Sequence, residues 1–366
     1  MSPIPKTGHR YAGQLTQALV SRGVLDESWT DAFTQVPRHL FLPAFYTRTP
    51  NAWELITPET VGPERWLQLA YHDLTWVQRL DGPGHIPGTP ASSSIQPSLA
   101  AQMLTALDPG PGDHVLEVGA GTGWLTALLS YRCGAGNVTG IELDPELIRH
   151  ARAALDELGY QPALIHADGF HGFAEHAPYH RVLSTAAVSH LPTPWLAQTQ
   201  PGGRIVAPLR GAIAVIDVRD QTHALGRFLP EPVQILPLRS SHDPARDTPI
   251  IESPRKPGSA PASTALRDPR FRFVLGLSNP TLTVDDPGLL GDLLVTDEHG
   301  SSTRVSALGQ VRTQGKRDLW AIVSHVHQWW EHTGQPGPAD FLIEVADTAQ
   351  WAILAGSKPE ERWRIR

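Results

Sequence analysis

The sequence predicts an α/β fold in which a doubly wound, Rossmann-like parallel sheet is followed by a smaller α+β extension. Short β-rich runs alternate with helical segments from residue 96 to about residue 220, and this alternation is typical of parallel strands joined by helices. A glycine-rich turn connects one of these runs to a helix. After a stretch rich in Pro, Ser and Arg, helical and alternating patterns return near the C-terminal end.

The first 90 residues are expected to hold helices and then loops. Apolar residues at helical spacing predict two short helices over residues 8–43, interrupted at Gly23 and Pro37. The residues that follow, up to about Pro90, are rich in Pro, Thr and Gly and are expected to be loop-like.

The alternating region is expected to form the sheet and its covering helices. Asp144 is placed to cap one of these helices, and Pro145 to occupy its first position. The predicted strands are 114–119, 137–143, 162–168, 180–185, 203–209 and 212–218. The predicted helices are 123–132, 144–159 and 193–200.

The chain is expected to divide into a catalytic domain over residues 1–225, a Pro/Ser-rich linker over 226–268 and an extension over 269–366. In the extension, the spacing predicts a helix over 318–334. Its apolar face would carry Leu319, Val323, Val326 and Trp330, with Asp318 as cap and Gly334 as stop. Residues 340–347 and 350–356 are expected to form a hairpin. The tryptophans Trp320, Trp329, Trp330 and Trp351 are interpreted mainly as core residues, with interface anchors as the alternative.

Composition excludes several classes of protein. The chain has 366 residues, 40% of them hydrophobic, and a formal net charge of −7, which makes broad binding to nucleic acid or anionic membranes a poor expectation. Cys133 is the only cysteine, so no intrachain disulfide can form. We find neither an apolar signal-peptide core nor an apolar run long enough to cross a membrane, and we expect a cytoplasmic protein. The oligomeric state is not predicted.

Three glycines, Gly119, Gly121 and Gly123, follow the strand 114–119 as GxGxG rather than the GxGxxG of dinucleotide folds. Glycines permit a sharp turn and close approach of the backbone to a ligand. A pyrophosphate needs a helix N-terminus aimed at it, so the different spacing favours a ligand that carries no pyrophosphate. Glu142 ends the next strand, where a carboxylate can accept both ribose hydroxyls, and Asp168 follows the third strand, near an adenine. Taken singly, each residue is equally compatible with a structural turn or cap. Together they predict a site for S-adenosylmethionine, or its product S-adenosylhomocysteine, formed by Glu117, Gly119, Ala120, Gly121, Gly123, Glu142, Leu143, Asp168 and Gly169.

Several quoted pieces, in order, resemble the protein-L-isoaspartate O-methyltransferase family. They are VPRHLFLP, YHD at residues 71–73, SSSIQP, LEVGAGTGW, ADGFHGFAEHAPYHRVLSTAA and LAQTQPGGRIVAPL, and they cover roughly residues 8–220. The resemblance implies a carboxyl methyltransferase that acts on a peptide or protein containing Asp or isoaspartate. It implies catalytic roles for Ser93 and Ser94 and substrate contacts from Ser92, Ile95, Tyr71, Asp73 and Thr185.

The segment SSSIQP departs from the family pattern T-I-S-(Q/A)-P. Ser93 falls on the Thr, Ser94 on the Ile, and Ile95 on the family's substrate-facing Ser, so the expected hydroxyl is displaced. A flexible turn and helix cap is the alternative role for Ser92 to Ser94. Because a carboxylate with an ordinary pKa near 4 is already a nucleophile, alignment rather than a general base is expected to drive catalysis. The pairs His325/His327 and His166/His171 lack a metal-like context, so no metal site is expected.

Three functions are compatible with this pattern. The extension resembles that of family members encoded with ribosomal peptide precursors (lasso peptides, lanthipeptides, graspetides), which methylate an Asp that then cyclises to aspartimide. The alternatives are a general isoaspartyl repair enzyme and a non-catalytic peptide-binding protein on the same fold. The intact cofactor set argues against the third.

Overall fold

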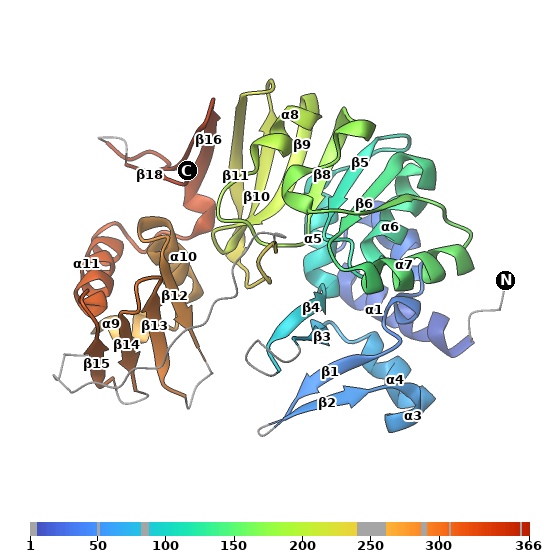
Figure 1. The fold of residues 1–366 in the computed structure, drawn as a ribbon, viewed down its shortest axis with the longest axis horizontal. Coiled ribbons are helices and arrows are strands. Elements are labelled where there is room, and N and C mark those ends of the chain that lie inside the picture. The colour runs from blue at the N-terminus through green and yellow to red at the C-terminus, as the bar shows by residue number, and fades with distance from the viewer. Residues whose placement is uncertain are drawn as a thin grey trace.

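A ten-stranded mixed sheet runs through the computed structural model and positions every other element (Figure 1). Its strand order is β18-β17-β16-β11-β10-β9-β8-β5-β6-β7. The structure describes residues 6–49, 52–81, 88–239, 261–286, 291–306, 309–358 and 361–366.

The parallel half of the sheet confirms the predicted strands. Val118 pairs with both Ile141 and Ser184, so three strand ends are level at one edge of the sheet. Loops that leave these ends must therefore meet over the same edge, where α/β sheets bind ligands. The strands are β5 (Val115–Val118), β6 (Val138–Glu142), β7 (Ala163–His166), β8 (Tyr179–Ser184) and β9 (Thr199–Leu209).

Alternating residues of the strands enter two separate cores, one on each face of the sheet. On β8, Leu183 belongs to the core that includes the N-terminal helices, whereas Val182 belongs to the core that includes the C-terminal extension. The predicted cap is confirmed, because the Asp144 carboxylate accepts a hydrogen bond from the Glu146 N–H at 2.9 Å and Pro145 begins the helix. The helices are α5 (Pro97–Leu107), α6 (Trp124–Cys133), α7 (Pro145–Glu157) and α8 (Thr193–Gln198), with single turns η3 (Ala135–Asn137), η4 (Gly169–His171) and η5 (Ala174–His176).

The antiparallel half of the sheet joins the C-terminal extension to the parallel half. Strand β11 pairs with β10 on one side and with β16 on the other, through partners such as Ala224 and Val345. The strands are β10 (Ala212–Val218), β11 (His223–Pro232), β16 (Phe341–Ala346), β17 (Ala349–Leu354) and β18 (Arg362–Arg364). The boundary predicted at residue 225 thus lies inside β11, and residues 226–232 of the predicted linker are strand. Residues 240–260 of that linker lie outside the described residues.

The loop-like prediction for the residues before Pro90 is wrong. These residues form a four-stranded antiparallel sheet with order β2-β1-β3-β4. Its strands are only four or five residues long, too short to show a clear alternation, and β1 is joined to β3 through the distant pair Tyr46 and Val77. The elements are α1 (Lys6–Ser21), η1 (Glu27–Trp29), α2 (Thr30–Gln35), η2 (Arg38–Phe41), β1 (Phe45–Arg48), β2 (Trp53–Ile56), α3 (Pro58–Val61), α4 (Pro63–Ala70), β3 (Trp76–Leu80) and β4 (Pro90–Ser94).

The extension confirms its predicted helix and hairpin. The four predicted apolar residues of α11 (Leu319–His332) are buried, Asp318 accepts from the Ala321 N–H at 3.0 Å, and Gly334 follows with φ +86°. Trp330 is buried and Trp329 packs edge-on against Trp363, which fits the core interpretation. The elements of this part of the chain that were not predicted are α9 (Pro261–Ala265), α10 (Pro269–Ser278), η6 (Pro338–Asp340), β18, and a sheet of β12 (Leu282–Asp285), β13 (Leu293–Asp297), β14 (Ser302–Val305) and β15 (Val311–Gln314). Over the described ranges, every helix is too short or too polar to cross a membrane.

Gly123 fixes the packing of α6 against α7. It has φ +94°, and an added Cβ would lie 3.0 Å from the Ala151 Cβ. Gly23, at the left-handed end of α1, has φ +68° but open space around its missing Cβ. Gly123→Ala should lower the free energy of unfolding by about 2–3 kcal/mol, and Gly23→Ala by only about 1 kcal/mol, because Gly23→Ala adds backbone strain without a steric clash.

Urea unfolding followed by circular dichroism measures both variants. Equal losses of stability in the two variants would show that Ala151 yields to the new methyl group and that Gly123 is needed only for its backbone conformation.

Candidate functional site

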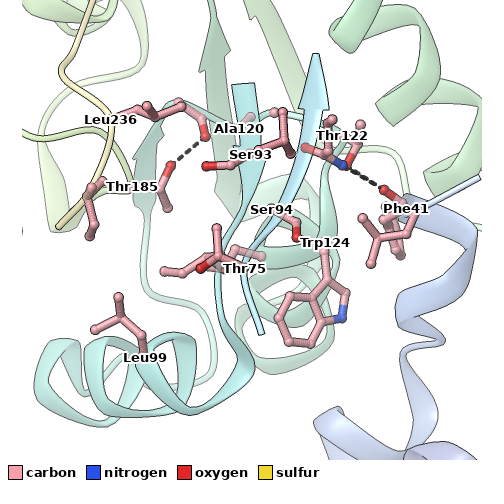
Figure 2. Close-up of a pocket in the computed structure, with 18 of the residues that line it drawn as sticks. Phe41, Thr75, Ser93, Ser94, Leu99, Ala120, Thr122, Trp124, Thr185 and Leu236 are labelled. Atoms are coloured by element: carbon pink, nitrogen blue, oxygen red, sulfur yellow. Dashed lines mark hydrogen bonds between the residues drawn. The ribbon is translucent and has the colours of Figure 1, made fainter. Parts of the chain in front are cut away.

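A cavity of about 350 Å³ lies over the level ends of β5 and β8, beneath strand β4 (Figure 2). We call it the strand-edge cavity. Most of its walls are apolar. Its polar groups include those of β4, here called the serine strand, and of residues 119–123, here called the glycine loop, together with Thr185, Arg38 and Gln78. It is lined by Arg38, Phe41, Leu42, Thr75, Val77, Gln78, Pro90, Ser93, Ser94, Ile95, Leu99, Glu117, Gly119, Ala120, Gly121, Thr122, Trp124, Leu125, Thr185 and residues 234–237.

A smaller cavity of about 90 Å³, the side cavity, adjoins it. The two cavities share Ser93, Gly119, Gly121 and Thr185 together with residues 235–237, so they are two parts of one site. The side cavity adds Ala91, Ser92, Ile141, Glu142, Leu143, Gly169, Ala186, Leu238 and Arg239. Most of the predicted cofactor and serine residues thus lie around one continuous space.

The serine strand β4 forms one wall of this space. Ser93 lines both cavities, whereas Ser94 lines only the strand-edge cavity. Figure 2 shows Ser93 on the Thr185 side of the cavity and Ser94 on the Trp124 side. The Ser94 hydroxyl accepts from the Trp76 N–H at 3.3 Å and from the Arg38 guanidinium at 3.3 Å. Ile95 also lines the strand-edge cavity, so the position of the family's hydroxyl presents an apolar side chain here.

Arg38 was not predicted, although it lies within the quoted piece VPRHLFLP. Its side chain is 1% exposed, and its guanidinium donates to the carbonyls of Ala70, His72, Leu74 and Ile95 at 2.6–3.1 Å. The guanidinium also lies 5.1 Å from the centre of the Trp124 ring. Burial lowers the pKa of Arg38 to about 9, so it is still a cation at neutral pH. The one sequence signal for it is an arginine set within an apolar run.

Gln78 and Thr122 fasten the glycine loop to the N-terminal region, and neither was predicted. The Gln78 amide donates to the Phe41 carbonyl at 3.0 Å and to the Thr122 hydroxyl at 2.8 Å. Thr122 in turn donates to the same carbonyl at 2.7 Å (Figure 2). These bonds join η2, β3 and the turn before α6, three segments whose proximity no local pattern reveals.

The glycine loop itself has the left-handed backbone that its glycines suggested. Gly119 has φ +82°, and an added Cβ would lie 2.9 Å from the Thr185 hydroxyl, which donates to the Gly119 carbonyl at 2.6 Å. Gly121 has φ +58°, and the space beside it is open to both cavities. Gly123, by contrast, lines neither cavity and packs against α7.

The two glutamates of the predicted cofactor set lie under the loop. Glu117 is 1% exposed, its carboxyl accepts from the Thr126 hydroxyl at 2.6 Å, and burial raises the pKa of Glu117 to about 8. Burial also raises the pKa of Glu142, while the Gly121 N–H, donating at 2.9 Å, opposes that rise. The other Glu142 oxygen accepts from the Asp144 N–H at 2.9 Å. Glu142 therefore holds the backbone of the site in shape, whereas Glu117 binds the Thr126 side chain of α6, and each residue lines one of the two cavities.

Besides Gly123, three predicted site residues lie away from the cavities. Asp168 caps η4 by accepting from the Phe170 N–H at 2.9 Å, and only its neighbour Gly169 lines the side cavity. The Tyr71 hydroxyl lies 2.8 Å from the ring nitrogen Nδ1 of His39. Asp73 pairs with Arg22 at 2.7 Å and accepts from the Ser98 N–H at 2.8 Å, which anchors the start of α5. Each of these three side chains contacts another group of the protein, and these contacts stabilise the local conformation of the chain.

Residues 234–239 were predicted as linker. Residues 234–237 line the strand-edge cavity, and residues 235–239 line the side cavity. Ala187 donates to the Leu236 carbonyl at 2.9 Å and accepts from the Leu238 N–H at 2.7 Å, which holds this segment beside the loop after β8. Within the described ranges, no three His, Cys, Asp or Glu side chains gather as a metal site would require.

Glu117→Gln should remove a pH dependence of stability. The pKa of Glu117 in the folded protein, about 8, lies above its ordinary value of 4.5. The carboxyl therefore contributes stability below pH 4.5 that is lost as the pH rises through 8, on the order of 5 kcal/mol. Urea unfolding of wild type and variant across this range measures the difference. Glu146→Gln, at an exposed position on α7, is the control. Equal pH slopes in wild type and Glu117→Gln would refute a buried, protonated Glu117.

Comparison with known proteins agrees with this geometry. The family model described as Protein-L-isoaspartate(D-aspartate) O-methyltransferase matches residues 11–224. A protein-L-isoaspartate O-methyltransferase of Aeropyrum pernix is 35% identical over 194 residues, or 52% of this chain and 61% of that protein, which is less than two thirds of its length. A protein-L-isoaspartate O-methyltransferase 2 of Polaromonas sp. is 33% identical over 230 residues, or 61% of this chain and 93% of that protein.

A solved structure titled protein-L-isoaspartate O-methyltransferase has a similar fold, with a TM-score of 0.54 and 20% identity over 92% of this chain and 96% of that one. That span includes residues beyond 224, so the likeness of fold extends into the C-terminal extension. The family match covers more than half of the sequence and includes the glycine loop, the serine strand and the ends of β5, β6 and β8. The chain therefore belongs to the protein-L-isoaspartate(D-aspartate) O-methyltransferase family.

Proposed function

We propose that this chain transfers the methyl group of S-adenosylmethionine to the side-chain carboxylate of an isoaspartyl or aspartyl residue in a peptide or protein. The observation that supports this most directly is the single space that joins the serine strand β4 to the glycine loop after β5. Family membership supplies the reaction class.

In this proposal the cofactor occupies the side cavity and the adjoining glycine loop. Glu142 and Leu143 would hold the ribose, Gly169 would lie against the adenine, and residues 119–121 would hold the amino-acid part. Gly121 fits this role because its missing side chain leaves open space on the cavity side. The bound cofactor supplies an electrophilic methyl group on a sulfonium.

The remaining apolar part of the strand-edge cavity would take the substrate carboxyl. Ser93, at the junction of the two cavities, can donate its hydroxyl hydrogen to one carboxylate oxygen and leave the other aligned for transfer. Walls such as Phe41, Val77 and Leu99 keep water away. Because a carboxylate and a sulfonium become a neutral ester and a thioether, a poorly hydrated cavity favours the reaction. Glu117 does not compete as a nucleophile at neutral pH, since burial raises its pKa to about 8.

A second candidate is the tailoring of a constrained ribosomal peptide. The specific observation in its favour is Ile95, which places an apolar group in the cavity where the family has a hydroxyl. After methylation, the next backbone nitrogen would attack the ester carbonyl, the C–O bond would break, and methanol would leave with the amide proton to give an aspartimide. The length of the chain does not favour this candidate, because a protein titled as an isoaspartyl methyltransferase aligns with 92% of it.

Gly121→Val tests the cofactor site. The branched side chain should fill the open space and weaken S-adenosylhomocysteine binding at least tenfold, about 1.4 kcal/mol or more, by titration calorimetry. Gly112→Val is the control, because Gly112 also has positive φ, at +82°, and open surroundings but lines neither cavity. Unchanged affinity in Gly121→Val would move the cofactor away from this loop.

Mass spectrometry of three substrates tests the reaction. A flexible isoaspartyl peptide, its aspartyl twin and a macrocyclic aspartyl peptide are incubated with S-adenosylmethionine and either wild type or Gly121→Val. A gain of one methyl group on the isoaspartyl peptide, followed by loss of methanol, is expected with wild type only. Methylation confined to the macrocycle would favour peptide tailoring. Binding of the peptides without any methyl transfer would favour the non-catalytic alternative.

A further inference from the structure

A third cavity, of about 380 Å³, lies between the catalytic sheet and the extension. We call it the extension cavity. One side is the turn between β9 and β10, with Arg210 and Gly211, and residues 232–234. The opposite side is α10 and β12, which contribute apolar side chains such as Phe273 and Val284.

Arg210 lines this cavity without pairing with any carboxylate of the described residues. Within the described ranges it forms no ion pair with a carboxylate, and its guanidinium donates only to the backbone carbonyls of Ile365 at 3.1 Å and Pro280 at 3.5 Å. The other lining arginine, Arg272, is already neutralised by Asp286 at 2.8 Å. Burial lowers the pKa of Arg210, and no neighbouring carboxylate offsets the effect. A half-buried guanidinium with unused N–H groups is suited to receive a carboxylate.

The backbone at Arg210 is costly for an arginine. Arg210 has φ +53° and Gly211 has φ +89°, so both central residues of this two-residue hairpin turn are left-handed. Asn and Gly are the residues that such turns favour. A long charged side chain at the first position adds backbone strain without improving the turn, and this pattern marks positions where the side chain serves another purpose.

The extension cavity adjoins the strand-edge cavity. Gln234 lines both, and the Val233 N–H donates to the Gly211 carbonyl at 2.7 Å, so the Arg210–Gly211 turn is attached directly to the segment between the two cavities. Consider a peptide whose target residue lies in the strand-edge cavity. If its chain passes over residues 232–234, one of its flanking residues lies beside Arg210.

We propose that the extension cavity is a substrate subsite that binds a glutamate flanking the methylated residue, with the carboxylate on Arg210 and the methylene groups against Phe273, Leu282 and Val284. The inference rests on the proposed function, because it assumes a peptide substrate. It assigns the extension a role in choosing which isoaspartyl or aspartyl residues are modified.

The test uses short isoaspartyl peptides in which one Glu is scanned over the flanking positions, each with a matched Gln peptide. Two measurements are made on the full chain: kcat/KM for methylation, and binding of the fluorescein-labelled peptides by anisotropy with S-adenosylhomocysteine present. Wild type should prefer Glu at one position about five- to tenfold in both measurements, mainly through KM. Arg210→Asn should abolish the preference, and Asn tolerates the left-handed backbone.

Arg210→Asp supplies the charge reversal and should prefer Lys to Glu at the same position. Arg227→Gln, which removes an exposed arginine from β11 that lines none of the three cavities, should leave the Glu preference intact. Absence of a Glu preference in wild type, or its persistence in Arg210→Asn, overturns the subsite. If no peptide is methylated, the proposed function fails, and the anisotropy measurements still decide whether Arg210 selects Glu.

Discussion

The buried guanidinium of Arg38 is the contact on which the shape of the site depends. It joins the turn after α4 to the end of the serine strand and lies against the ring of Trp124 at the start of α6. Among the described residues it has carbonyl and hydroxyl partners rather than a carboxylate, so its charge is stabilised by several dipoles at once. The N-terminal sheet, the glycine loop and helix α6 thus meet around the Arg38 guanidinium. The strand-edge cavity is the space left between them.

Much of the parallel sheet and part of the site could be predicted, because neighbouring residues in the sequence determine both. Buried strands, the cap at Asp144 and the glycines at 119 and 121 each have a short-range signal that reflects their own backbone requirements. The four-stranded N-terminal sheet has no such signal, because its strands of four or five residues are too short to show an alternation and β1 also needs the more distant β3 as a partner. Arg38, Gln78 and residues 234–237 were not predicted because they reach the site only through tertiary packing.

The corrections to the predicted site have a common cause. Tyr71, Asp73 and Asp168 occur in pieces that resemble the family, yet their side chains are committed to His39, to Arg22 and Ser98, and to the cap of η4. Such residues shape the backbone that carries the cavity-lining groups. A sequence pattern reports that a residue matters for the arrangement, whereas only the coordinates separate groups that face the cavity from groups that support its walls.

The pairing of β11 with β16 has a consequence for how the chain must be synthesised. Roughly a hundred residues separate Pro232 from Phe341, so at about 5–20 residues per second the ribosome needs roughly 5–20 s between finishing one strand and starting its partner. During that interval β11 is a ten-residue edge with Leu225 exposed and its hydrogen-bonding groups unpaired. A growing chain is therefore open to pairing with its neighbours on the same messenger, and translation speed through the extension becomes a determinant of soluble yield.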